Sequence, residues 1–280
     1  KQLQESKDSP MPDVSRFVHG LFERSYPYRI LHGGNHSAIT NLLKRYKFAS
    51  SDKKAPAGLS LGSIDSTGPF QAEAKLFQDN EADSIHVPVA TGSESLSGTS
   101  HESNYVATQT CESILASMVQ DHSLDQDFCL IGDKGTGKTI LIQEFARRLG
   151  YNIEGMLLYK DMTSRDLLLR RVTKKNELAA VQDTAWEYSP LIRAAMDGQI
   201  AVLDNIDRLP PTTLATLASL IQDRQINLFN GERMVSDARH KQLQKHLNLT
   251  EEELTARGIL RIHPSFRIIA TSHQVDKTAA

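Results

Sequence analysis

The fold is decided by the stretch Phe128-Cys129-Leu130-Ile131-Gly132-Asp133-Lys134-Gly135-Thr136-Gly137-Lys138-Thr139. Its first four residues are apolar and predict a strand, while its last eight match the pattern G-x-x-x-x-G-K-[ST] at every position. Apolar residues then recur at helical spacing from Lys138 to about Leu149. A strand, a glycine-rich turn and a helix in this order predict a phosphate-binding loop. The alternative is a glycine-rich strand-to-helix turn with a surface lysine.

The glycines of this loop allow successive backbone N–H groups to turn inward, and the start of the following helix adds positive potential. Lys138 is expected to reach the β- and γ-phosphates of a nucleotide, and the Thr139 hydroxyl to bind Mg²⁺. The residues predicted to form the site are Gly132, Asp133, Lys134, Gly135, Thr136, Gly137, Lys138 and Thr139.

A carboxylate that holds the metal is expected at the end of a neighbouring strand. The run Ile200-Ala201-Val202-Leu203-Asp204 is apolar and ends in an acid. Acidic residues at strand ends are common, but this one lies downstream of a complete loop motif. We therefore predict that Asp204 holds Mg²⁺, usually through a water molecule.

Apolar strands alternate with helices in the C-terminal part of the chain. After Phe128–Ile131, strands are expected at Gly155–Tyr159, Gln199–Leu203 and Arg267–Ala270. Such alternation is typical of parallel sheets that are buried on both faces. The predicted fold class is therefore α/β, with a parallel P-loop sheet flanked by helices.

Local signals place further elements around this sheet. Thr108 or Thr110 is expected to cap a helix with one apolar stripe. Asn230-Gly231 predicts a β-hairpin, and Thr250-x-x-Glu253 predicts a capping box at the start of a short helix. Trp186 is expected either in a hairpin inserted before the Asp204 strand or simply packed in the interior. The stripe of the capped helix comprises Cys111, Ile114, Leu115, Met118 and Val119.

The first part of the chain consists of two segments that differ in composition and in predicted structure. Residues 1–48 contain two expected short helices, Val14–Arg24 and Ala38–Tyr46. Residues 49–103 are rich in Ser, Gly, Ala, Pro and Asp, which predicts a linker with a short β element at Ala72–Phe77 and Ile85–Val89. The predicted nucleotide-binding core then occupies residues 104–280.

Composition argues against several classes of function. Lys and Arg number 32 against 34 Asp and Glu, a formal charge of −2, which gives no support to nucleic-acid binding or to an anionic-membrane patch. No apolar run approaches the roughly 18 residues that span a bilayer. We therefore expect no nucleic acid as partner and no membrane insertion. Two cysteines are too few for a disulfide framework, and Cys129, within an apolar run, is expected to be buried.

The loop, the Asp204 strand and the stretch Phe266-Arg267-Ile268-Ile269-Ala270-Thr271 together resemble the AAA+ ATPases, in particular the MoxR and dynein/midasin-related branch. The resemblance covers about residues 104–273, and residues 1–48 resemble the lid of a preceding module. It implies ATP as ligand, Mg²⁺ as cofactor and ATP hydrolysis as activity. As partners it implies further AAA+ modules of the same chain or a homo-oligomeric ring. The stretches Lys160–Leu168 and Trp186–Ala195 further resemble one particular member of this branch, and that resemblance implies a mitochondrial location, which nothing in the composition shows.

Two positions depart from the pattern of this family. Asn205 stands where a glutamate usually polarises the attacking water, and an amide orients water but cannot take its proton at neutral pH. Asp207 is a candidate substitute for that glutamate. His273 stands where the family usually places an asparagine, and histidine can still donate one hydrogen bond. The candidate catalytic residues are thus Asn205, Asp207 and His273, and hydrolysis is expected to be weak.

These departures leave two functions open. The lid and the arginine finger of the family are expected to lie beyond Ala280, so the chain is expected to be a fragment that binds ATP better than it hydrolyses it. The leading expectation is Mg-ATP binding and hydrolysis by one module of a larger ATPase. The alternative is a non-hydrolysing module that holds nucleotide to stiffen an assembly. A small-molecule kinase shares the loop, but no acceptor-binding signature accompanies it.

Overall fold

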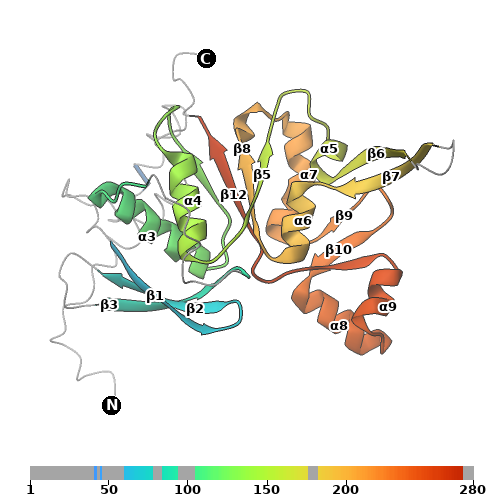
Figure 1. Ribbon diagram of the computed structural model, residues 1–280, viewed down its shortest axis with the longest axis horizontal. Helices are drawn as coiled ribbons and strands as arrows, with labels where there is room; N and C mark the ends of the chain where they lie inside the picture. The colour runs from blue at the N-terminus through green and yellow to red at the C-terminus, as the bar shows by residue number, and fades with distance from the viewer. Residues whose placement is uncertain are drawn as a thin grey trace. The chain divides into compact units, whose positions relative to one another are not determined.

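A computed structural model describes residues 41–42, 45, 60–77, 84–93, 105–175 and 182–273 of the chain. The predicted helix Val14–Arg24 lies outside these residues. Within the predicted helix Ala38–Tyr46, the described residues Asn41, Leu42 and Arg45 are helical. Residues 59–273 form one compact unit. All the strands and helices from β1 to β12 described below lie within it (Figure 1).

Four parallel strands form the central sheet, in the order β4-β12-β8-β5 (Figure 1). This confirms the predicted α/β fold with a parallel sheet. The chain passes from β4 at one edge of this sheet to β5 at the other edge, and returns through β8 to β12, which lies between β8 and β4. The strands are β4 (Phe128–Ile131), β5 (Ile153–Leu157), β8 (Ile200–Asp204) and β12 (Arg267–Ser272).

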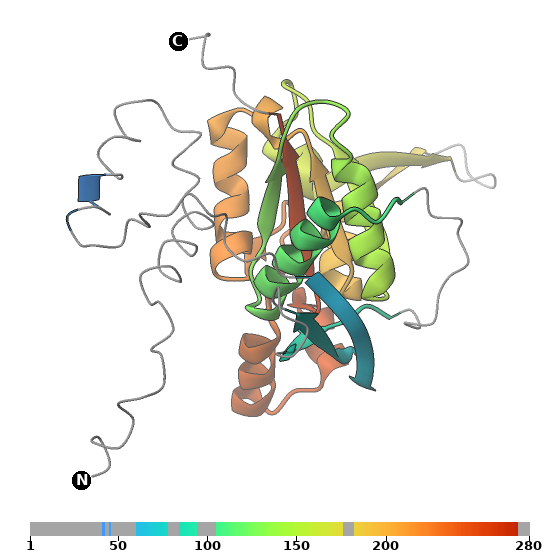
Figure 2. The ribbon, with the colours of Figure 1, turned by 90° about the vertical axis from the view of Figure 1, so that its left-hand side faces the viewer.

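Helices cover both faces of this sheet because successive side chains of a strand point to opposite faces. Ile269 of β12 packs into a core formed with α3 and α4, whereas Ile268 and Ala270 pack into a second core formed with α6 and α7. Figure 2 shows the strands between α4 on one side and α7 on the other. The helices are α3 (Gln109–Ser123), α4 (Lys138–Arg148), α5 (Ser164–Leu168), α6 (Pro190–Asp197) and α7 (Pro211–Gln222).

The expectation that Cys129 is buried is wrong, because this residue is exposed. Strand β4 lies at the edge of the described sheet, and its Phe128 and Leu130 side chains face the core that contains α3 and α4. Cys129 and Ile131 alternate with them and therefore point to the other face, where both are exposed. An apolar run at a sheet edge thus buries only one of its two faces.

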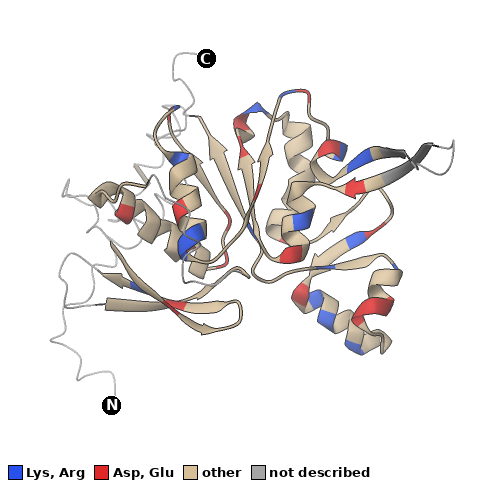
Figure 3. Cartoon of the chain, viewed as in Figure 1, with Lys and Arg blue, Asp and Glu red and all other residues tan. Residues whose placement is uncertain are grey.

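Two hairpins, two further helices, the 3-10 helix η1 and the strand β11 complete the C-terminal part, and basic and acidic residues are interspersed over these elements (Figure 3). The predicted hairpin around Asn230-Gly231 is confirmed, as is the one that carries Trp186. The capping box is also present, since Glu253 N–H donates to Thr250 Oγ1 and Thr250 N–H donates to the Glu253 carboxylate. The elements are β6 (Leu169–Lys175), β7 (Gln182–Tyr188), η1 (Ile206–Arg208), β9 (Ile226–Asn227), β10 (Arg233–Ser236), α8 (Asp237–Leu247), α9 (Glu251–Ala256) and β11 (Ile259–Ile262).

A three-stranded antiparallel sheet precedes α3, with strands β1 (Ser60–Gly68), β2 (Gln71–Phe77) and β3 (Ser84–Ala90). Strands β2 and β3 match the two predicted strands. Strand β1 was not predicted, because its Ser- and Gly-rich sequence lacks a regular apolar alternation. Strand β1 forms because its backbone pairs with that of β2, and not because its sequence favours a strand.

This small sheet packs against α3, and its inward side chains share a core with those of α3 and α4. Ala72, Ala74 and Leu76 of β2 are buried in that core. The chain that leaves β3 then passes close to the end of α4, where Gly92 N–H donates to the Leu149 carbonyl at 3.0 Å. A Cβ atom at Gly92 would lie 2.1 Å from the carbonyl oxygen of Gly150, so the close approach requires glycine.

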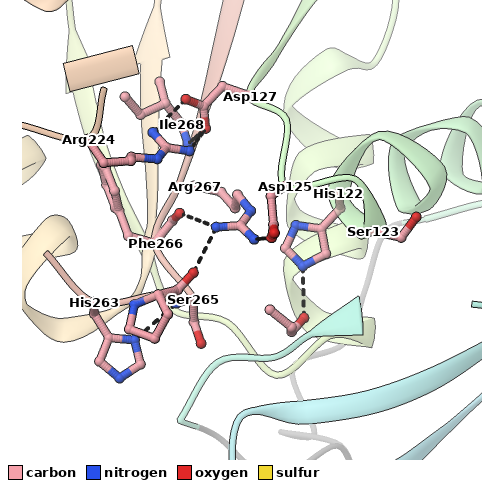
Figure 4. Close-up of polar contacts among 12 residues, drawn as sticks. His122, Ser123, Asp125, Asp127, Arg224, His263, Ser265, Phe266, Arg267 and Ile268 are labelled. Carbon is pink, nitrogen blue, oxygen red and sulfur yellow. Dashed lines mark hydrogen bonds and ion pairs between the residues drawn. The ribbon is translucent and has the colours of Figure 1, made fainter. Parts of the chain in front are cut away.

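A polar cluster joins the small sheet to α3 and to the start of β12 (Figure 4). His122 of α3 is buried, and its Nε2–H donates to the Ala90 carbonyl of β3 at 2.8 Å. Arg267 is buried at the start of β12 and pairs with Asp125 in the turn after α3. Burial, aided by the nearby Arg267 guanidinium, lowers the pKa of His122 to about 4.

The buried imidazole of His122 makes the free energy of unfolding depend on pH. As the pH falls, His122 is protonated in the unfolded chain, where its pKa is near 6.5, before it is protonated in the folded chain. The contribution of the neutral imidazole to the free energy of unfolding is therefore complete above about pH 6.5 and is lost as the pH falls toward 4. At pH 5 the free energy of unfolding should be lower by about 2 kcal/mol. Urea unfolding at pH 7 and pH 5 should show a smaller loss for His122→Gln than for the wild type.

The exposed His246 of α8 provides the matched control, because His246→Gln removes an imidazole without emptying a buried site. This variant should keep the wild-type loss of stability between pH 7 and pH 5. An equal loss in His122→Gln and in the wild type would show that the buried imidazole does not titrate as described.

Candidate functional site

The predicted site residues lie at the carboxyl ends of three neighbouring parallel strands. The loop follows β4, Asp204 ends β8, and His273 follows β12. Because these strands are parallel and adjacent, their carboxyl ends share one edge of the sheet. In open α/β sheets this edge is where ligands bind.

The glycine-rich loop has the backbone conformation that its composition predicts. Gly135 and Gly137 have φ values of 84° and 83°, in the left-handed region that favours glycine. The loop is closed by Thr136, whose Oγ1 donates to the Asp133 carbonyl at 2.9 Å. Gly137 is also the N-cap of α4, so the first N–H groups of that helix face the loop. A turn of this kind can hold phosphate oxygens with backbone N–H groups.

Lys138 places its positive charge over the start of the loop. Its Nζ donates to the carbonyls of Gly132 and Asp133, at 2.8 Å and 2.9 Å. Thr139 follows in the first turn of α4 and is exposed. The ammonium group, the helix N-terminus and the loop N–H groups therefore present positive potential at one place, which suits a polyphosphate.

Asp204 is held by a residue that sequence reasoning did not select. Thr271 Oγ1 donates to Asp204 Oδ1 and accepts a hydrogen bond from Asn205 N–H at 3.1 Å. The Thr271 side chain lies in β12, beside the end of β8, and is buried. The sequence does place a threonine, Thr271, near the end of the predicted strand that follows Phe266. One sequence alone does not tell which strand lies beside it, so its contact with Asp204 could not be predicted.

Asn205 itself lies in the left-handed region, with φ 62° and ψ 53°. Asparagine tolerates this conformation better than other residues with a side chain, apart from aspartate. The turn at Asn205 leads into η1, which carries Asp207. A departure from the family pattern thus coincides with a local backbone requirement.

Asp207 and His273 meet across the ends of β8 and β12. His273 N–H donates to Asp207 Oδ1 at 3.3 Å, and the His273 Nδ1 lies 3.7 Å from the same oxygen. Partial burial alone would raise the pKa of Asp207, but the hydrogen bond from the His273 backbone and further donors outweigh it and lower the pKa. Asp207 is therefore ionised at neutral pH.

Three consecutive residues of the β12 end thus connect the parts of the site. Thr271 contacts Asp204, the Ser272 carbonyl accepts from Gly132 N–H at 3.2 Å, and His273 contacts Asp207. Within the described part of the chain, no hydrogen bond joins Thr139 to Asp204. Both nevertheless offer oxygen atoms, the ligands that Mg²⁺ prefers, so their chemistry fits this ion.

The family model of the AAA domain (dynein-related subfamily) matches residues 127–280. The chain is 38% identical to mouse von Willebrand factor A domain-containing protein 8 over 246 residues, which is 88% of this chain and 13% of that protein. It is 31% identical to Protein NorQ of Paracoccus denitrificans over 102 residues, 36% of each protein. It is also 31% identical to Protein MoxR of Methylorubrum extorquens over 103 residues, 37% of this chain and 29% of that protein.

The chain therefore spans about an eighth of the length of the first of these relatives and about a third of the other two. Apart from the first, the matches cover little more than a third of this chain.

The left-handed conformation of Asn205 predicts a graded response to substitution. Asn205→Gly should leave the free energy of unfolding nearly unchanged, because glycine adopts this φ without steric cost. Asn205→Val should lower it by about 1–3 kcal/mol, because a β-branched side chain clashes there. Urea unfolding of the two variants measures the difference, and equal stability would contradict the described turn.

Proposed function

We propose, because this chain belongs to the dynein-related subfamily of AAA domains, that it binds ATP with Mg²⁺ and hydrolyses ATP as one module of a larger AAA+ assembly. Family membership supports nucleotide binding and an ATPase-type function in general. The identity of the nucleotide, the metal and the rate of hydrolysis are parts of the proposal. So are the partners, which are further AAA+ modules of the same chain or a homo-oligomeric ring.

The observation that carries the proposal is the glycine-rich loop between β4 and α4. Residues 132–137 supply backbone N–H groups, and Lys138 supplies the charge that would contact the β- and γ-phosphates. Thr139 and Asp204 are the proposed Mg²⁺ ligands. When bound, Mg²⁺ neutralises charge that develops on the phosphate oxygens.

Hydrolysis requires that a water molecule be held for attack on the γ-phosphate. In this proposal the Asn205 amide orients the water, and the Asp207 carboxylate, steadied by His273, accepts its proton. The lowered pKa of Asp207 makes this carboxylate a weak base. Loss of an effective general base costs roughly 10²- to 10⁴-fold in rate, so slow turnover is expected.

The second candidate function is a non-hydrolysing module that holds nucleotide to stiffen an assembly. It is favoured by the amide at Asn205, at the position of the usual acid. The two candidates share the binding step and differ only in phosphate release.

Binding is tested by a thermal shift of the chain with Mg-ATP. Nucleotide at 100 times its Kd should stabilise the folded chain by about 2.7 kcal/mol, because it binds only the folded state. Lys138→Ala should lose most of this shift, since Lys138 Nζ lies over the loop.

An exposed lysine outside the loop, Lys241 of α8, is the matched control. Lys241→Ala should keep the wild-type shift with Mg-ATP. Absence of a shift at millimolar nucleotide, or an equal shift in Lys138→Ala and the wild type, would remove the proposal.

Hydrolysis is tested by phosphate release from the full-length assembly. The proposal expects slow release that falls at least tenfold in Asp207→Asn and rises in Asn205→Asp, while nucleotide binding is kept. Aspartate is the better replacement than glutamate at position 205, because it tolerates the left-handed conformation. No release from the wild type, together with intact binding, would support the non-hydrolysing module instead.

A further inference from the structure

Thr271 occupies a central place in the candidate site although its side chain is buried from solvent. It lies near the end of β12, the strand between β4 and β8. Only 2% of its surface is exposed. A threonine hydroxyl has one donor and two acceptor positions, and this one uses both functions, toward Asp204 Oδ1 and from Asn205 N–H.

The contact with Asp204 selects one orientation of the carboxylate. Its Oδ1 accepts from Thr271, while Oδ2 accepts no hydrogen bond from any residue that the structure describes. The hydroxyl therefore occupies one oxygen and leaves the other for a ligand. Groups that hold a metal ligand in place in this way commonly change metal affinity by 10- to 100-fold.

The contact with Asn205 fixes the turn that follows. By accepting the Asn205 N–H, the same hydroxyl holds the left-handed residue at the start of η1. The neighbouring Ser272 carbonyl binds Gly132 N–H, so β12 also sets the start of the loop. Asp204 and the loop are thus positioned by adjacent residues of a single strand.

We infer that Thr271 is a positioning residue for Mg²⁺: its hydroxyl orients the Asp204 carboxylate so that the free oxygen can serve the metal of the bound nucleotide. This inference rests on the proposed function. Thr271 itself touches neither nucleotide nor metal in this role, and its effect is exerted through Asp204.

The test compares Thr271→Val with Thr271→Ser by titrating Mg²⁺ against a fluorescent ATP analogue bound to the chain. Valine keeps the shape but removes the hydroxyl, so half-maximal Mg²⁺-dependent binding should require 10- to 100-fold more Mg²⁺. Serine keeps the hydroxyl and should retain the wild-type Mg²⁺ requirement. Binding of the analogue in EDTA should be the same in all three proteins.

Thr213 of α7 is the matched control for a merely structural effect. It is also buried, but its hydroxyl donates to the Met162 carbonyl and not to Asp204 or the loop. Thr213→Val should lower the stability of the chain without changing the Mg²⁺ requirement. If Thr271→Val behaves in the same way, Thr271 is structural only and the inference is wrong.

Thr271→Cys keeps the inference testable if the valine variant does not fold. A thiol is a weak donor, so this variant should need more Mg²⁺ than the wild type. An unchanged Mg²⁺ requirement would overturn the inference. Failure of the wild type to bind the analogue at all would instead overturn the proposed function, whereas failure of the inference alone leaves nucleotide binding intact.

Discussion

The parallel pairing of β12 with both β4 and β8 is the constraint on which the candidate site depends. In the described part of the chain, no hydrogen bond joins the loop after β4 directly to Asp204 at the end of β8. Each is bonded instead to the end of β12, through Ser272 and Thr271. A shift of β12 by one residue would exchange the two faces of the strand and separate Thr271 from Asp204.

The opposite end of β12 is held by charge rather than by apolar contacts alone. Arg267 is buried there and pairs with Asp125, while the Asp127 carboxylate accepts from Ile268 N–H and pairs with Arg224. A buried guanidinium is costly unless it is paired, so these contacts favour one placement of the strand over alternatives. The small β-sheet packs beside this end through His122, which ties residues before α3 to the same part of the fold.

The proposed site combines a complete loop with an amide at Asn205 and a carboxylate at Asp207. Asn205 lies where its backbone needs the left-handed conformation, and the next carboxylate along the chain after Asp204 is that of Asp207, two residues after Asn205. His273 N–H donates to the Asp207 carboxylate, and Asn205 N–H donates to Thr271. Both unusual positions, Asn205 and His273, are therefore held by contacts between the end of β8 and the end of β12. In the proposed function, this arrangement binds a charged ligand and hydrolyses it slowly.

Local patterns predicted much of this architecture from the sequence alone. The loop, the strand that ends at Asp204, the hairpin at Asn230-Gly231 and the capping box at Thr250 all depend on residues within a few positions of one another. Only the tertiary structure decided which strands are neighbours. The pairing of β1 with β2 joins residues 3 to 17 positions apart. The contacts of Thr271 and His273 join residues 66 or 67 positions apart, and the pairing of β4 with β12, which leaves Cys129 at the sheet edge, joins residues 141 positions apart. Such contacts follow from the burial and register of whole strands, and no local pattern records them.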